Sequence, residues 1–546
     1  MKCELRIMKR RFIPLLMTLA AASGILVGYF YGSPSAGSNQ AFIMQGSNKL
    51  NYLLQLVDNH YVDTVDMAKL VEDAMPEILS QLDPHSRYIS ASEIEGENEQ
   101  LRGTFGGIGI QFTIQKDTVN VMSLIPTGPA EKVGIMPGDR IVRADTTSLV
   151  GMKDTDVMKQ LKGEKLSIVE LGVIRRGHKG ELTFKVQRDD IPVVSIDASY
   201  LMPGGIGYVR VKNFGEHTYG ELMVALARLK VEGMKSLMLD LRGNSGGYMH
   251  IAIQMANEFL PRNQLIVYTE GRKSQREDFR SDGYGTFQQL PLVILVDEGS
   301  ASASEILSGA IQDNDRGMIV GRRTFGKGLV QQPINFRDGS AIRLTVARYY
   351  TPSGRCIQKP YENGHDADYE NDLLARYQRG EFFSQDSIHQ TGPTYQTRIG
   401  RIVYGGGGIM PDIFIPEDTT HVTSYYKEAL VSGLLREFAF TYTDENRQRL
   451  ATYTTTAALA NFLRGENLAE QFARFGESHD LKRRNLLMQK SRQLLERYLI
   501  GSIIYNARSM QEYVEYLNRE DKTVLRAQEI LRDGKSRPQL SQGTED

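Results

Sequence analysis

One long apolar run and a series of shorter periodic segments divide this chain into parts. Residues 12–31 are twenty residues without a charge, and as a helix they would reach about 30 Å, the thickness of the apolar core of a bilayer. Three basic residues, Lys9, Arg10 and Arg11, precede the run. By the positive-inside rule we expect residues 1–11 to remain as a cytosolic tail, residues 12–31 to anchor the chain in a membrane, and the remainder to be exported. A cleaved signal sequence is the alternative.

The chain after the apolar run shows two kinds of periodicity. Residues 46–100 carry apolar side chains three and four positions apart and are predicted to be helical. Residues 103–190 contain short alternating strands separated by glycine turns, with a helix near Thr155–Leu161. Residues 191–360 alternate strands with helices, an order typical of an α/β domain, and residues 401–418 are expected to complete that domain.

Two further segments have patterns of their own. Residues 361–400 are polar and aperiodic and are predicted to be an insertion into the α/β domain. Residues 419–546 are helical in pattern and are predicted to form a C-terminal extension. Within the α/β domain, the clearest predicted elements are the strands Ile206–Val211, Ser236–Leu241, Leu292–Val296 and Met318–Val320 and the helices Tyr219–Val231, Met249–Leu260 and one that begins near Ser302.

Composition removes several classes of protein. The 546 residues are enough for roughly three to four domains. The formal net charge is −1 with charged residues at 24%, which excludes a nucleic-acid binder that relies on overall positive charge. The two cysteines exclude a disulfide-rich scaffold, and no cysteine and histidine spacing is typical of a structural zinc site. We therefore expect neither a metal nor a nucleic-acid partner.

Three glycine-rich segments compete for the chemistry. Gly243–Gly247 fits the G-x-S-x-G turn of α/β-hydrolases, with Ser245 as nucleophile and His250 as a nearby base. The same segment can instead be a loop whose backbone amides bind a developing anion. Gly321–Gly328 nearly matches a phosphate-binding loop, but Gly328 stands where the magnesium-binding hydroxyl is required, so nucleotide binding is disfavoured.

The third segment, Gly299–Glu305, follows a predicted buried strand and opens an apolar helix. Its small residues let a backbone or a substrate approach closely. A serine in this segment needs a base, and a lysine serves only if burial lowers its pKa from about 10.4 to roughly 7–8. Lys327, between two glycines and next to apolar residues, suits such a dry pocket. A helix N-cap with small packing residues and a solvated lysine are the ordinary alternatives.

Five segments carry a resemblance to a known family when they are taken together in order. They are Leu82–Ser86, Asp240–Gly247, Gly299–Glu305 with Gln312 and Asp313, Thr324–Gly328 with Gln331, and Gly408–Asp412. This set resembles the carboxyl-terminal processing peptidases, also called tail-specific proteases, of serine peptidase family S41. The resemblance covers residues 48–360 and 401–416, and the combination is far more specific than any one motif.

The resemblance implies a role for several residues. In the family, the middle serine of the third segment is the nucleophile and the lysine is the general base, which implies these roles for Ser302 and Lys327. A glutamine four residues after the lysine orients it, here Gln331. Asp313 matches an acidic position that supports the site by placing the helix that carries the serine. No metal or cofactor is required.

The resemblance also implies an oxyanion hole made by backbone amides. One amide is that of Ala303, the residue after the serine, and the other is that of Gly246 or Gly247 in the second segment. Ser245 then occupies a variable position of that segment, and its match to the hydrolase turn becomes a coincidence.

Residues 103–190 resemble a PDZ domain. Phe105–Phe112 is a glycine loop that enters an alternating strand, and Gly134–Ile141 contains a Pro-Gly-Asp turn. Loop amides of this kind bind a C-terminal carboxylate, and the strand edge accepts the peptide as an extra strand. The residues implied to bind the peptide are Gly106, Gly107, Ile108, Gly109 and Ile110.

These features together predict a multidomain α+β protein with a membrane helix, a helical segment, a PDZ domain, a crotonase-like ββα spiral core and C-terminal helices. The expected function is a serine endopeptidase that cuts near the C-termini of exported or misfolded proteins. Its expected partners are polypeptide C-termini, the membrane and, through the helical ends, a second copy or an adaptor. The expected location is a bacterial-type inner membrane, with the bulk of the chain in the periplasm. A catalytically silent PDZ adaptor and a Ser245/His250 esterase are the alternatives.

Overall fold

The computed structural model describes residues 48–539, with the exception of residues 95, 97–98, 100–101, 116, 363–365 and 389–391. The expected basic tail (1–11) and membrane helix (12–31) lie outside the described residues. Within the described part, no helix combines the length and the apolar character that crossing a bilayer requires. The chain divides into two compact units, residues 1–78 and 79–546.

Two helices make up the described part of the first unit. They are α3 (Asn48–His60) and α4 (Met67–Ser80), and α4 runs two residues past the boundary between the units. Pro76 lies inside α4, where its ring removes one backbone hydrogen bond. The helical region predicted for residues 46–100 is confirmed as far as Ser80, but Arg87–Ile89 of the same region form a strand, β1.

Residues 104–192 form the predicted PDZ domain, whose antiparallel sheet has the order β3-β4-β5-β7-β8, with β6 paired to β5. A ribbon of β2 and β9 carries the chain into and out of the domain. Among the described strands β3 pairs with β4 alone, so β3 is an edge strand. The elements are β2 (Thr104–Gly107), β3 (Ile110–Gln115), β4 (Thr118–Leu124), α6 (Pro129–Lys132), β5 (Arg140–Ala144), β6 (Thr147–Ser148), α7 (Asp154–Leu161), β7 (Ile168–Ile174), β8 (Glu181–Gln187) and β9 (Asp189–Pro192).

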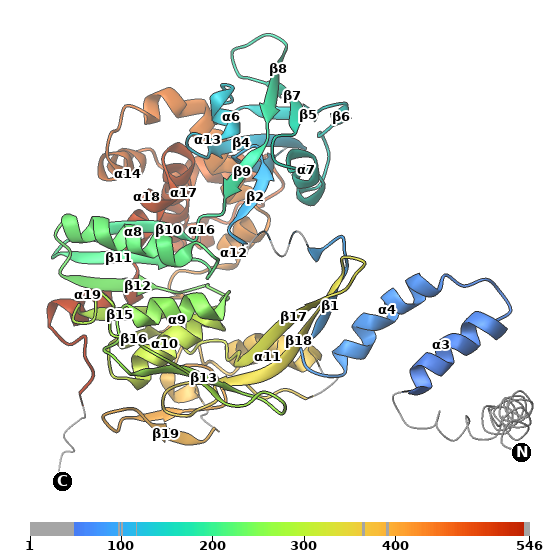
Figure 1. The fold of residues 1–546 in the computed structure, drawn as a ribbon. Helices are drawn as coiled ribbons and strands as arrows, with labels where there is room; N and C mark the ends of the chain where they lie inside the picture. Colours follow the sequence, from blue (N-terminus) through green and yellow to red (C-terminus); the bar gives the residue numbers. More distant parts are fainter. Residues whose placement is uncertain are drawn as a thin grey trace, which may run out of the picture. The chain divides into compact units, whose positions relative to one another are not determined.

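The α/β core is built on a six-stranded sheet with the order β10-β11-β12-β15-β16-β21 (Figure 1). β10 and β11 are antiparallel, and the other neighbours are parallel. The four strands predicted from the sequence are confirmed to within one residue at each end. The strands are β10 (Ile196–Met202), β11 (Ile206–Val211), β12 (Ser236–Asp240), β15 (Leu292–Val296), β16 (Met318–Gly321) and β21 (Ile413–Phe414).

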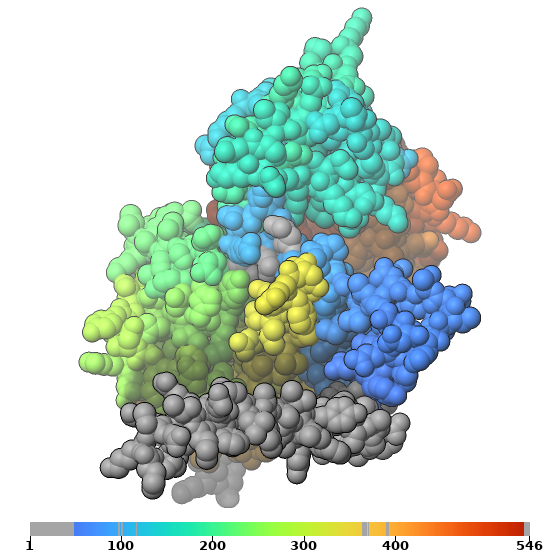
Figure 2. Space-filling view, turned by 45° about the vertical axis from the view of Figure 1, so that its right-hand side comes forward, coloured from blue at the N-terminus to red at the C-terminus, as the bar shows by residue number. Residues whose placement is uncertain are grey.

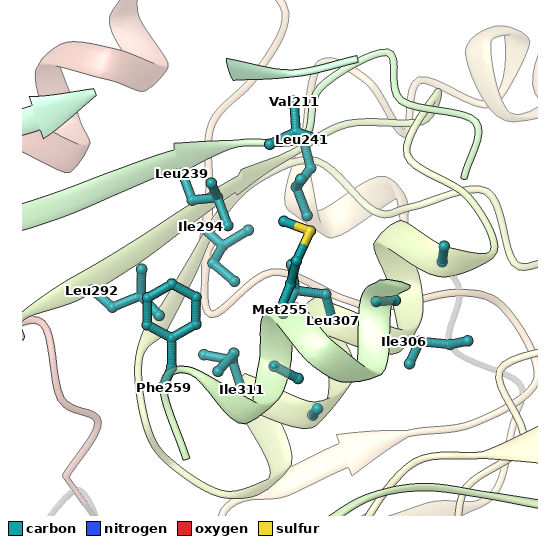
Figure 3. Packing of buried hydrophobic residues seen from close by; sticks show 14 of the residues in the cluster. Val211, Leu239, Leu241, Met255, Phe259, Leu292, Ile294, Ile306, Leu307 and Ile311 are labelled. Carbon is teal, nitrogen blue, oxygen red and sulfur yellow. The ribbon is translucent and has the colours of Figure 1, made fainter. Parts of the chain in front are cut away.

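Both faces of this sheet are buried, because helices cover each of them. On one face lie α8 (Thr218–Val231), α9 (Met249–Asn257) and α10 (Ala303–Asp313). Alternate side chains of a strand point to opposite faces, so Leu239 packs toward these helices and Met238 away from them. Figure 3 shows the layer between the sheet and the helices, where Leu239, Ile294, Met255, Phe259, Leu307 and Ile311 meet.

A second, five-stranded antiparallel sheet has the order β1-β18-β13-β14, with β17 paired to β18. The tip of the β17–β18 hairpin carries the exposed side chains Ile334 and Phe336 and lies at the surface, in yellow in Figure 2. β17 begins two residues after Lys327, so a strand follows this loop where a phosphate-binding loop would be followed by a helix. The strands are β1 (Arg87–Ile89), β13 (Leu265–Glu270), β14 (Glu277–Arg280), β17 (Leu329–Asn335) and β18 (Ala341–Tyr350).

Residues 361–400 are not aperiodic throughout, and the prediction of an irregular insertion is wrong in this respect. They contain a helix, α11 (Asp366–Gln378), a short turn, η1 (Gln385–Ser387), and a strand, β19 (Thr394–Gln396), that pairs with β20 (Ile402–Tyr404). The apolar period is weak because α11 buries polar as well as aromatic side chains.

Helices α12 to α19 follow the core and confirm the predicted helical extension. α18 and α19 cover the second face of the six-stranded sheet, where Val524 and Ile530 pack with Met238 and Val293 (Figure 1). Asp521, the N-cap residue of α19, accepts a hydrogen bond from Arg242 at 2.9 Å. The helices are α12 (Ser424–Val431), α13 (Leu434–Leu450), α14 (Thr456–Gly465), α15 (Leu468–Glu477), α16 (Asn485–Lys490), α17 (Arg492–Ala507), α18 (Met510–Asn518) and α19 (Lys522–Arg532).

Candidate active site

Three loops that follow neighbouring parallel strands carry the residues proposed for the chemistry. Residues 241–248 follow β12, residues 297–302 follow β15, and residues 322–328 follow β16. The carboxyl ends of parallel strands meet at one edge of a sheet, where ligands commonly bind in α/β folds. The topology therefore brings together segments that are far apart in the sequence.

Ser302 lies at the N-terminus of α10 in a strained backbone conformation. Its φ is +55°, a region that side chains other than glycine rarely adopt and that typically costs about 1–3 kcal/mol. The residues of α10 behind it are all buried, whereas Ser302 itself is partly exposed. The helix thus holds the serine rigidly in an accessible, strained position, as expected for a nucleophile.

The glycine loop after β12 packs directly against the serine. A Cβ atom on Gly246 would lie 2.8 Å from the Ala301 carbonyl oxygen and 2.8 Å from Ser302 Cβ, so only glycine fits. The carbonyl oxygen of Asn244 accepts hydrogen bonds from the Ala301 amide (3.0 Å) and the Ser304 hydroxyl (2.9 Å). These contacts fix the loop relative to the start of α10.

The structure separates the two glycines that the sequence left as candidates for the oxyanion hole. The Gly246 amide donates to Asn244 Oδ1 at 2.8 Å and is therefore occupied, which corrects its inclusion among the candidate donors. In the described part of the chain no hydrogen bond occupies the amides of Gly247 and Ala303. Two unoccupied backbone donors remain beside Ser302.

Lys327 is largely buried among charged neighbours. Its pKa is lowered, first by burial and then by the guanidinium groups of Arg343 and Arg87, while Glu305 and Asp83 act in the opposite direction. No hydrogen bond joins Lys327 Nζ to Ser302 Oγ in the described structure. The connection between the two residues runs through their backbones.

Glu305 makes this backbone connection, and the sequence analysis did not single it out. Its carboxylate accepts the amides of Ser302 (2.8 Å) and Lys327 (2.8 Å) on Oε2, and the amide of Gly326 (2.8 Å) and the hydroxyl of Thr324 (2.5 Å) on Oε1. Glu305 is fully buried, and burial raises its pKa to about 7 against these four donors. One side chain therefore holds both the serine and the lysine loop.

Tyr349 also links Ser302 to Lys327, because its hydroxyl contacts the backbone carbonyl oxygens of both residues. Its hydroxyl lies 2.5 Å from the Lys327 carbonyl oxygen and 3.1 Å from that of Ser302. Tyr349 comes from β18 and is buried. Glu305 could have been found from the sequence, because Ser302 and Glu305 form the Ser-x-x-Glu pattern that is typical of a helix start. No sequence pattern points to Tyr349.

Gln331 and Asp313 lie in different surroundings. Gln331, on β17, donates from Nε2 to Thr345 Oγ1 at 3.3 Å and has no hydrogen bond with Lys327 in the described structure. Asp313, at the far end of α10 from Ser302, accepts from the fully buried Arg355 at 2.7 Å and from the Ser353 amide at 3.1 Å. Asp313 therefore fixes the end of the helix whose start carries the serine.

The elements of the alternative esterase do not assemble. Ser245 and His250 are both exposed, and no hydrogen bond joins them in the described structure. His250 Nε2 lies 3.6 Å from Glu216 on the surface instead. The second glycine-rich segment is also occupied, because the Lys327 amide, which a phosphate-binding loop would need, donates to Glu305.

The predicted peptide-binding loop joins β2 to the edge strand β3. Gly106 and Gly107 belong to β2 and pair with Asp190 and Asp189 of β9, while the Ile108 side chain is buried in the domain core. Gly109 has a φ of +76°, which turns the chain into β3, and Ile110 opens that strand. The five positions thus lie at one end of a strand whose outer edge has no partner among the described strands.

Comparisons with known proteins decide the family. A profile of peptidase family S41 matches residues 205–370, and a PDZ profile matches residues 106–190. The carboxy-terminal-processing protease of Bartonella bacilliformis is 37% identical over 312 residues, which cover 56% of this chain and 71% of that protein. This chain belongs to the carboxy-terminal processing proteases of family S41.

A second curated relative of this S41 protease agrees. Carboxy-terminal processing protease CtpA of Bacillus subtilis is 32% identical over 357 residues, covering 64% of this chain and 76% of the relative. A solved photosystem II D1 C-terminal processing protease is 29% identical, with coverage of 69% and 95% and a TM-score of 0.35. Residues 425–508 match a family of unknown function.

The family membership confirms several predictions. The S41 protease is a serine peptidase with a PDZ domain, and the structure adds the α/β core and the C-terminal helices. The interpretation as an enzyme is confirmed, and the silent adaptor and the α/β-hydrolase esterase lose their support.

Proposed function

We propose that this S41 protease cleaves polypeptides near their C-termini with Ser302 as nucleophile and Lys327 as general base. The observation that carries the proposal is the Glu305 carboxylate, which binds the backbone amides of both residues and so places the two segments side by side. The strained serine at the start of α10 and the lowered pKa of Lys327 support the same roles.

The reaction follows from these roles. Neutral Lys327 takes the proton of the Ser302 hydroxyl as the oxygen attacks a peptide carbonyl carbon. The resulting ammonium group then protonates the leaving amine, and the acyl-enzyme forms. Water, deprotonated by the same lysine, hydrolyses the ester and releases the new C-terminus.

The negative oxygen of the tetrahedral intermediate is bound by the amides of Ala303 and Gly247. Both donors are unoccupied in the described part of the chain and belong to segments that are fixed to each other by Asn244. Removing one such donor typically costs about 2.7–4 kcal/mol of transition-state stabilisation. Gln331 and Asp313 support the site, the first through Thr345 and the second through Arg355.

The PDZ domain selects the substrate. A peptide tail adds to the free edge of β3 while its carboxylate meets the amides of the loop from Gly106 to Ile110. Selection for a free C-terminus favours flexible or unfolded chain ends, since folded proteins often hold their ends in structure. No cofactor takes part in this scheme.

The proposed location rests on the N-terminal sequence alone. Residues 12–31 anchor the protease in the inner membrane of a bacterium, with the basic tail (1–11) in the cytosol and the catalytic part in the periplasm. The proposed partners of the outer surfaces of the helical ends are a second copy or an adaptor.

Single-residue variants test the dyad. Ser302→Ala and Lys327→Ala are expected to abolish cleavage of an unfolded protein with a free C-terminal tag, while Ser245→Ala and His250→Ala keep full activity. A fluorophosphonate or slow acyl substrate, mapped by mass spectrometry, is expected to label Ser302. Label on another serine, or activity retained by Lys327→Ala, would refute the proposed mechanism.

A further inference from the structure

The inserted helix α11 is fastened to the loop that carries Lys327. Arg376 of α11 is buried and donates to the carbonyl oxygens of Thr324 (3.1 Å) and Arg323 (2.7 Å). The five S41-like sequence segments include no residue of α11. The inserted helix thus binds the carbonyl groups of the loop that carries Lys327, while Glu305 binds amides of the same loop.

Tyr369 is the aromatic residue that α11 contributes to this contact. Its side chain is buried, and its hydroxyl oxygen lies 2.9 Å from Nε2 of His85. Its ring meets Phe325 edge-on at a centroid distance of 5.8 Å, and Lys359 Nζ lies 3.9 Å from the ring centroid. Tyr369 therefore joins the insertion, the lysine loop and the segment that contains His85.

His85 belongs to a continuous series of hydrogen bonds that ends at Gln331. The His85 amide donates to Asp83 Oδ1 at 3.0 Å, and the same oxygen accepts the Thr345 hydroxyl at 2.9 Å. Thr345 Oγ1 in turn accepts from Gln331 Nε2 at 3.3 Å. Through these contacts, the Leu82–Ser86 motif of the family is linked to Tyr369 on one side and to the strand after the lysine on the other.

The charge of Lys327 acts on His85. The pKa of His85 is lowered to about 4, first by burial and then by Lys327, so the imidazole is neutral near pH 7. A neutral ring in this position adds no charge to the pocket. The other charged groups that act on the two residues are Arg343, Arg87, Glu305 and Asp83 for Lys327, and Asp83 and Lys359 for His85.

We propose that Tyr369 is a positioning residue for the reaction: its hydroxyl holds the His85 ring, its own ring packs against Phe325 of the loop that carries Lys327, and these side chains together exclude water from the lysine. The inference rests on the proposed role of Lys327 as the base. Without the hydroxyl, Nε2 of His85 loses its hydrogen-bond partner in a buried site. A buried polar atom without a partner binds a water molecule, or its side chain rotates toward water. Water beside Lys327 solvates the ammonium form and makes the lysine a base only at higher pH.

The variant Tyr369→Phe tests this role, since it keeps the ring contacts and removes only the hydroxyl. We expect the rising limb of the pH profile of kcat/KM to move upward by roughly one pH unit, with about tenfold lower activity below the limb and recovery of the rate above it. Tyr377→Phe is the matched control, because Tyr377 lies on the same helix and is 41% exposed. It is expected to leave the profile unchanged.

A second measurement does not depend on activity. In the Ser302→Ala background, the rate at which Lys327 is acetylated as a function of pH, followed by peptide mass spectrometry, is expected to shift by the same amount in Tyr369→Phe. If Tyr369→Phe does not fold, His85→Gln is measured in the same way and is expected to show the same direction of shift.

The outcomes separate the two levels of the argument. The role of Tyr369 is overturned if Lys327→Ala abolishes activity but neither Tyr369→Phe nor His85→Gln moves the midpoint of the pH profile. It is also overturned if both variants lower the rate equally at every pH. In either case the proposed pair of Ser302 and Lys327 stands. If Lys327→Ala keeps activity, the proposed base itself is wrong. A shift in the Tyr377→Phe control would also overturn the inference, because the effect would then not be specific to the hydroxyl of Tyr369.

Discussion

Replacing Glu305 with glutamine tests whether one buried acid governs the stability of the catalytic core. The side chain is fully buried, and burial raises its pKa from 4.5 to about 7. The folded state therefore favours the protonated form. The contribution of Glu305 to the free energy of unfolding is greatest below pH 4.5 and is lost as the pH rises through 7.

The size of the effect follows from the shift. A difference of 2.5 pKa units between 4.5 and 7 corresponds to roughly 3.4 kcal/mol at 1.36 kcal/mol per unit. Roughly 2.5 kcal/mol of this falls between pH 5 and pH 8. Glutamine does not titrate, so the wild-type protein should lose that much more stability than Glu305→Gln over this interval. Differences between the two side chains that do not depend on pH cancel in the comparison.

Hydrogen exchange of the α10 amides provides the assay. The chain has several domains and no tryptophan, so a single fluorescence transition would not isolate the core. The opening free energy of α10 is measured at pH 5 and pH 8 in both proteins. An equal pH dependence in the two proteins would refute the argument. Activity is expected to fall in Glu305→Gln, because a glutamine oxygen cannot accept from all four donors.

Three further changes have defined outcomes. Gly247→Ala places a Cβ atom 2.3 Å from the Phe214 carbonyl oxygen at a φ of +148° and so displaces the Gly247 amide. We expect at least a hundredfold loss of kcat/KM with an unchanged circular dichroism spectrum. Retained activity would exclude this amide from the oxyanion hole. Arg355→Met leaves Asp313 charged and buried without its partner and should lower stability by about 3–5 kcal/mol in thermal unfolding. Gly109→Ala forces a side chain into a φ of +76°, which typically costs about 1 kcal/mol. The free loop relieves this strain by leaving that conformation and must return to it to bind, so calorimetry should show roughly fivefold weaker binding of a C-terminal peptide. Unchanged affinity would count against the loop.

Local patterns predicted the elements that carry the site. The buried strand Leu292–Val296 is a continuous apolar run, and Ser236–Leu241 has three apolar residues in succession at its centre, because helices cover both faces of their sheet. The resemblance to the family then supplied the residues that the folded chain brings to one edge of that sheet. The helix start at Ser302 is also visible in the sequence, because a run of small residues is followed there by an apolar helical segment.

The contacts between distant segments could not be predicted from the sequence. Gln331 faces Thr345 rather than Lys327 because the register of two antiparallel strands decides its neighbour, and no local pattern encodes that register. Gly246 was a candidate donor until the side chain of Asn244 proved to occupy its amide. Tyr369 lies in a polar segment whose few apolar positions gave no helical period, although the helix is packed against the catalytic loop.

The ion pair between Arg242 and Asp521 ties α19 to the end of β12, from which the loop that contains Gly247 departs. A chain made from its N-terminus leaves one face of the central sheet bare until α19 has been synthesised, because Val524 and Ile530 are what cover Met238 and Val293. The sheet that carries Ser302 and Lys327 at its edge therefore reaches its final packing only after residues 522–532 have been made. A chain made only as far as the loops after β12, β15 and β16 still exposes apolar surface on the sheet that carries them.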